Sequence, residues 1–239
     1  MQRWIAPLVL CLAARPASAQ TVAPVPRYRA GWWDVASVAV AGTAYLLPSA
    51  LGLPKNGPSC VPCNPASLPG IDRWVVGPVS NSADIGSDVV LAGIAGLTAF
   101  VGLTGQTSDQ LRGNFAMFAN TASWTAAATE WVKVTVHRER PVLYTTGAAA
   151  AAADKDNEQS MPSMHAALAF AAATSYFVMS LREHLPHRKR NAALLYAGAV
   201  GVGVLRVAAA KHFPTDVLAG AALGSAMGWL GPTVHPIVH

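Results

Sequence analysis

The sequence Met161-Pro-Ser-Met-His165 begins a long apolar stretch that runs to Leu181, and the rest of the chain is interpreted around it. Alanine, leucine and methionine dominate this stretch without strict alternation, so it predicts a helix rather than a strand. Pro162 suits the first turn of that helix, and Ser160 is a candidate cap. Such a polar helix start can bind an anion through its unpaired N–H groups, or it can be only a capped helix beside an incidental histidine.

Five further apolar stretches have lengths close to the ~20 residues of a bilayer span. They cover residues 35–53, 88–103, 114–132, 191–207 and 216–230. Charged residues make up only 12% of the 239 residues, about half of the usual ~25%. We therefore expect an all-α, six-helix bundle that is embedded in a membrane, with an alanine-rich soluble bundle as the alternative. The stretch 114–132 is the least membrane-like, because its polar residues would have to face the bundle interior.

The N-terminal residues have the pattern of an export signal. Arg3 precedes an apolar run and then Ala17-Ser-Ala19, which predicts a signal peptide over residues 1–19, with an uncleaved anchor as the alternative. Residues 20–34 are expected to be a linker, residues 35–87 a first helix with a cysteine-containing loop, and residues 88–239 the core domain. The net charge of +5 is compatible with phosphorylated or anionic partners, but no basic stripe with interleaved aromatic residues indicates nucleic acid.

The loop 182–190 is rich in arginine and lysine, which by the positive-inside bias places it in the cytoplasm. The start of the helix at 164–181 and the loop with Cys60 and Cys63 would then face outward. A cleaved signal conflicts with this topology, because six spans in this orientation need the N-terminus inside. Either stretch 35–53 does not span, or the signal is retained, or the bundle is soluble.

Cys60 and Cys63 form a C-x-x-C pair in a proline-rich loop. No second pair of ligands stands at zinc-site spacing, and no thioredoxin-like pattern surrounds the cysteines. In an exported loop the pair predicts a structural disulfide.

Two polar clusters flank the stretch at Met161. In the first, Lys133, His137 and Arg140 would share one helix face, and Pro141 would end the helix at Arg140. Cations so placed can clamp an anion, although a basic helix end at a membrane border has the same composition.

In the second cluster, Arg206 closes the stretch 191–207 and His212 stands just before Pro214, which starts the next helix. Asp216 can reach back to one nitrogen of His212, which would make the other nitrogen a better nucleophile. Alternatively, Asp216 is a helix cap beside an interfacial histidine. Lys211 is expected to be a solvated neighbour, with ligand binding as the alternative.

Taken together, Lys-x6-Arg-Pro, Pro-Ser-x-His and Arg-x5-His-x3-Asp stand in this order at three successive helix ends. This arrangement closely resembles the type 2 phosphatidic acid phosphatase (PAP2) superfamily over about residues 88–231. That superfamily includes bacterial lipid phosphatases, soluble exported acid phosphatases and vanadium haloperoxidases.

The resemblance implies catalytic roles for the two histidines and the aspartate. His212 would attack phosphorus and become a phosphohistidine, Asp216 would orient it, and His165 would protonate the leaving oxygen. The phosphoryl oxygens would be held by Lys133, Arg140, Ser163, Met164 and Arg206. No metal or cofactor is implied. Two positions depart from the family pattern, because Met164 stands where glycine is usual and Leu205 where serine is usual, so the substrate fit should be altered.

The expected function is a metal-independent phosphatase for a lipid phosphate or diphosphate, at the periplasmic face of the inner membrane of a bacterial cell envelope. The alternatives are a soluble periplasmic acid phosphatase that acts on small phosphoesters, or a catalytically degenerate membrane relative. A vanadium haloperoxidase is disfavoured because the chain is short and nothing in it suggests a halide site.

Overall fold

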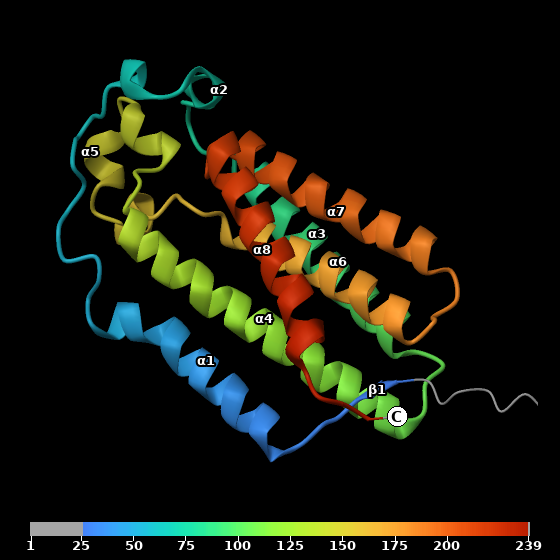
Figure 1. The fold of residues 1–239 in the computed structure, drawn as a ribbon. Coiled ribbons are helices and arrows are strands. Elements are labelled where there is room, and N and C mark those ends of the chain that lie inside the picture. Colours follow the sequence, from blue (N-terminus) through green and yellow to red (C-terminus); the bar gives the residue numbers. More distant parts are fainter. Residues whose placement is uncertain (1–25, 239) are drawn as a thin grey trace, which may run out of the picture.

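The fold is given by a computed structural model that describes residues 26–238, within which six long helices form a bundle (Figure 1). These helices are α1 (Trp32–Ala50), α3 (Asn81–Leu103), α4 (Ser108–Val136), α6 (Met164–Arg182), α7 (Arg188–Ala208) and α8 (Pro214–Val234). Helices α2 (Gly70–Arg73) and α5 (Ala148–Ala151) are single turns, and the two-residue strands β1 (Arg27–Tyr28) and β2 (Ile237–Val238) pair antiparallel. The prediction of an all-α, six-helix bundle is confirmed.

The boundaries at the N-terminal side differ from the prediction. The expected linker 20–34 is wrong at its end, because α1 already begins at Trp32. The Asp34 carboxylate accepts the Gly31 N–H at 2.8 Å, which caps a helix that begins three residues earlier than the apolar pattern suggests. The predicted signal peptide lies outside the described residues.

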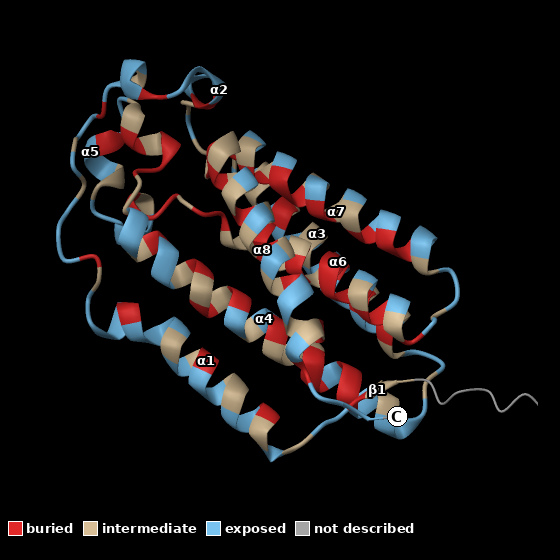
Figure 2. Ribbon diagram, viewed as in Figure 1, coloured by how far each residue is buried: buried red, intermediate tan, exposed pale blue. Residues whose placement is uncertain are grey.

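Helix α6 is the centre of the bundle, and most of its length is buried, whereas α1 is largely half-buried or exposed (Figure 2). The closest partner of α6 is α8, which presents Gly220, Gly224 and Gly228 to α6 at four-residue spacing. A Cβ atom added to Gly224 would lie 2.0 Å from the carbonyl oxygen of Ala167 on α6. The two backbones therefore touch, as small residues allow at helix interfaces in membranes.

Four helices in the described part, α3, α6, α7 and α8, are long and apolar enough to cross a membrane. Such helices are typical of a membrane protein. The sequence predicted six stretches of near-spanning length, and α1 and α4 are not among the four. Helix α4 differs because it carries Thr121, Thr125 and Thr129, which are buried. Each hydroxyl donates to the backbone carbonyl four residues earlier, so these polar side chains are satisfied inside the bundle.

Several helix ends meet at one end of the bundle, beside α2 and α5 (Figure 1). They are the start of α3, the end of α4, the start of α6 and the junction between α7 and α8. The opposite end holds the β1–β2 pair and the turn between α6 and α7. The three polar clusters of the sequence thus lie at the same end.

Candidate active site

A polar cavity of about 410 Å³ lies among these helix ends. Two histidines, four cations and four carboxylates contribute to its wall, together with Tyr45 and Met164. These ionisable residues are His165, His212, Lys133, Arg140, Arg206, Lys211, Asp84, Asp88, Glu130 and Asp156. The cavity therefore takes residues from all three predicted clusters. Ser163 is completely buried and is not among the lining residues.

The first cluster reaches the cavity in a different way from the prediction. Helix α4 ends at Val136, and His137 adopts a left-handed conformation with φ of 48°, so Arg140 lies beyond the helix rather than on its face. His137 turns away, with its Nε2 3.1 Å from Glu158 Oε2. Arg140 is 4% exposed and donates to Asp156 at 2.9 Å, and its Nε–H has no partner among the described residues. An unpaired buried donor of this kind can serve a bound anion.

Arg206 has a similar environment at the end of α7. It forms an ion pair with Asp84 of α3 and donates to Ser87 Oγ at 3.1 Å, while its Nε–H lacks a partner in the described chain. Lys211 Nζ lies 3.3 Å from the same Asp84 carboxylate. Lys211, which was expected to be a solvated neighbour, also lines the cavity with Arg206.

The start of α6 also differs in detail. Ser163 rather than Ser160 is the cap, since its Oγ accepts the Ala166 N–H at 3.5 Å, and Pro162 precedes the helix. His165 lies half-buried in the cavity wall, with its Nε2 2.6 Å from Asp88 Oδ1. A carboxylate can only accept in this contact, so His165 Nε2 carries a proton.

His212 is 1% exposed, and its Nδ1 lies 2.7 Å from the backbone carbonyl oxygen of Ser160. A carbonyl only accepts, so Nδ1 is protonated and the lone pair of the neutral ring is on Nε2. The predicted direct bond from Asp216 is not formed, because the nearest carboxylate oxygen is 3.8 Å away. That oxygen instead accepts the Phe213 N–H at 2.8 Å and the Ser160 hydroxyl at 2.5 Å.

The protonation of His212 follows from its surroundings. Burial lowers the pKa of His212 to about 3, and the cations Arg140 and Arg206 also lower it, against the opposing effect of Asp216. The ring is therefore neutral throughout the physiological range. A neutral, oriented imidazole in a cavity with four cations has the features of a nucleophile for an anionic phosphorus centre.

Comparison with known families identifies the family of the chain. The model of the PAP2 superfamily matches residues 114–237, which is more than half of the chain and includes all three clusters. The chain belongs to the PAP2 superfamily. No curated protein and no solved structure matches it.

The two departures from the PAP2 pattern have different settings. Met164 is the first residue of α6 and lines the cavity, so its side chain occupies space that a glycine would leave open. Leu205 points toward α3, where its methyl carbons lie 3.8 Å from the position of a Cβ on Gly86. At this position an apolar contact between α3 and α7 replaces the hydrogen-bonding group of the usual serine.

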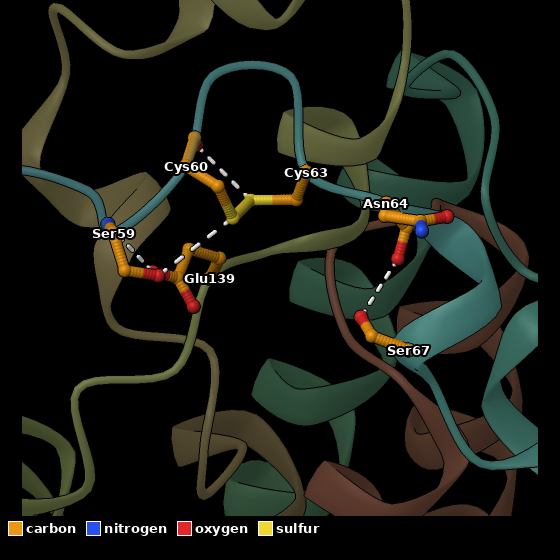
Figure 3. The surroundings of a disulfide bond; sticks show 6 residues. All are labelled: Ser59, Cys60, Cys63, Asn64, Ser67 and Glu139. Atoms are coloured by element: carbon orange, nitrogen blue, oxygen red, sulfur yellow. Dashed lines mark hydrogen bonds between the residues drawn. A yellow bond between two sulfur atoms is a disulfide. The ribbon is translucent and has the colours of Figure 1, made fainter.

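Cys60 and Cys63 are joined by a disulfide in this PAP2 protein (Figure 3). The loop is tied to the segment that carries Arg140, because the Ser59 N–H donates to Glu139 Oε1 at 2.9 Å and the Cys63 N–H donates to the Leu143 carbonyl at 2.8 Å. Glu139 lies close to both sulfur atoms, but sulfurs bonded to each other do not offer thiolates to a metal. The loop therefore braces the site.

Sequence reasoning missed the acidic partners of this PAP2 site. Asp84 and Asp88 stand four residues apart at the start of α3, and their spacing on one helix face was the available signal. Asp156 comes from a loop without any recognisable code. Arg138 was hidden between the motif residues Lys133 and Arg140, and nothing in its spacing distinguishes it.

Proposed function

We propose that this PAP2 protein is a metal-independent phosphatase that releases phosphate from a lipid phosphate or diphosphate through a phosphohistidine at His212. The observation that supports it best is the convergence of His212, His165 and the buried cations in one polar cavity.

In the first step, His212 Nε2 attacks phosphorus, an N–P bond forms and the bond to the leaving oxygen breaks. His165 acts as an imidazolium: it gives the Nε2 proton that it shares with Asp88 to that oxygen and becomes neutral, so the lipid leaves as an alcohol or a monophosphate. In the second step, water attacks phosphorus and gives its proton to His165, the N–P bond breaks and inorganic phosphate departs. Lys133, Arg140 and Arg206 stabilise the charge on the phosphoryl oxygens in both steps.

The apolar groove supports a lipid substrate. It has a volume of about 230 Å³ and is lined by α3, α4 and α6, the same helices that supply Asp88, Lys133 and His165 to the polar cavity. On α6 the groove begins at Leu168, three residues or ~4.5 Å beyond His165. On α3 it begins at Ala95, seven residues or ~10 Å beyond Asp88, and runs to Leu103. A hydrocarbon tail in this groove would place its head group among the cations.

The proposed location is the periplasmic face of a bacterial inner membrane. The basic turn between α6 and α7 lies at the end of the bundle opposite the cavity, and the positive-inside bias favours the cytoplasm for such a turn. The disulfide at Cys60 and Cys63 lies on the cavity side, which suits an oxidising compartment.

The test is a phosphate-release panel in detergent micelles, with phosphatidate, phosphatidylglycerol phosphate, undecaprenyl diphosphate and a soluble phosphoester, each with and without a chelator. The proposal predicts release from lipid substrates that the chelator does not change. His212→Ala should abolish it, and His235→Ala, at the other end of the bundle, should not. Release from the soluble ester alone would favour an exported acid phosphatase, and no release from any substrate would favour a degenerate member.

A further inference from the structure

Arg138 lies behind His212 rather than in the cavity wall. Its guanidinium donates to Asp72 Oδ2 at 2.8 Å and to Thr215 Oγ1 at 2.6 Å, and it forms an ion pair with Asp216. The guanidinium carbon also lies 4.4 Å from the centre of the Phe213 ring. Both carboxylates are completely buried, so these ion pairs are shielded from solvent.

Asp72 anchors this arrangement from the short helix α2. Besides Arg138 it accepts the Thr215 N–H at 3.1 Å and the Thr215 hydroxyl at 2.7 Å, at the first turn of α8. Asp216 in turn accepts the Ser160 hydroxyl, and the Ser160 carbonyl accepts Nδ1–H of His212. A continuous chain of contacts therefore runs from Asp72 to the imidazole.

The charged groups in this series of contacts determine the net charge next to the imidazole. Asp72 and Asp216 each carry one negative charge and Arg138 carries one positive charge, which leaves one net negative charge behind His212. When a phosphohistidine forms through Nε2, Nδ1 stays protonated and the ring becomes cationic. A single buried negative charge stabilises that cation, whereas two uncompensated buried carboxylates would take up a proton.

We propose that Arg138 and Asp72 are positioning residues for the nucleophile. Arg138 holds Asp216 so that the Ser160 carbonyl fixes the tautomer of His212. Asp72 supplies the second negative charge, so that Asp72, Arg138 and Asp216 together carry one net negative charge. The catalytic part of this inference rests on the proposed phosphatase function, whereas the part on the tautomer does not.

The variants Asp72→Asn, Arg138→Met and Arg138→Lys test the inference, and Asp34→Asn is the matched control. Asp34 is also a buried carboxylate, but it lies at the opposite end, near His235. Asp72→Asn is nearly isosteric, so it still tests the inference if the Arg138 variants do not fold. Thermal unfolding identifies the folded variants.

For folded protein we expect Asp72→Asn and Arg138→Met to lower kcat by about 10- to 100-fold with KM within about twofold, as misplacement of a reacting group does. Arg138→Lys should recover part of the loss, and Asp34→Asn should leave kcat unchanged. Nitrogen-15 NMR of labelled histidines gives a readout without turnover. Wild-type His212 should be a single Nδ1–H tautomer, and Arg138→Met should show a mixture.

A kcat within twofold of wild type, with a single tautomer in both folded Asp72→Asn and Arg138→Met, would overturn the positioning role. If the wild type releases no phosphate but Arg138→Met changes the tautomer, the positioning role stands and the proposed function fails. If turnover is present and the tautomer does not change in Arg138→Met, the proposed function stands and the positioning role fails.

Discussion

Phosphate release should persist to a much lower pH than a histidine nucleophile usually allows. In the proposed mechanism His212 attacks only in its neutral form, and burial lowers its pKa to about 3. The active form is therefore present above about pH 3 and is lost as the pH falls through that value. At pH 5 a histidine with the ordinary pKa of ~6.5 is neutral in about 3% of molecules, whereas a pKa of about 3 leaves about 99% neutral. At pH 5, kcat/KM should thus be about 30-fold higher than an ordinary histidine permits.

The assay measures kcat/KM from pH 4 to pH 8 in detergent micelles, because this ratio reports ionisations of the free enzyme. The separately titrated ionisation of the substrate phosphate is corrected for, and tryptophan fluorescence shows that the protein stays folded at each pH. An acid limb with a midpoint near pH 6.5 would refute the reasoning, since the nucleophile would then be an exposed histidine or another group.

Three further predictions concern packing, cavity shape and the bracing loop. Gly224→Ala should destabilise the protein by about 1–3 kcal/mol in thermal unfolding, because the new methyl would overlap the backbone of α6. Gly93→Ala on α3 meets nothing within 4 Å and should leave stability unchanged or raise it by up to about 1 kcal/mol, so equal losses would contradict the packing account. Met164→Gly should open the cavity and raise kcat/KM for lipid phosphates, at a stability cost of at most about 1 kcal/mol; an unchanged ratio would show that this side chain does not restrict the site. Replacing Cys60 and Cys63 together by serine should lower stability by up to ~2 kcal/mol, whereas an unchanged unfolding midpoint would exclude a bracing role.

Much of the fold was predictable because apolar periodicity determines helices directly. The core stretches 114–132, 164–181, 191–207 and 216–230 all lie within observed helices, and the motifs predicted which helix ends meet. The sequence predicted the helix ends less accurately. Side-chain caps such as Asp34, and the left-handed turn at His137, depend on local hydrogen bonds that hydrophobic patterns do not encode.

The site was predictable in its motif residues and not in their partners. The motifs named His212, His165 and the cations, and the fold brings them to one cavity, although Arg140 lies beyond α4 rather than on its face. The bond from His212 to the Ser160 carbonyl could not be predicted, because main-chain acceptors leave no trace in residue type. Asp72 is separated from Asp216 by most of the chain, and only the fold brings both of them to Arg138.

The most direct test of the central claim is to trap the phosphoenzyme. The protein is mixed for milliseconds with phosphatidate labelled in its phosphate, quenched in alkali, which preserves phosphohistidine, and analysed by peptide mass spectrometry. The account predicts a labelled phosphoryl group on the peptide that contains His212, and none in His212→Ala. Lipid-dependent phosphate release without any such adduct, or equal release by His212→Ala, would contradict it.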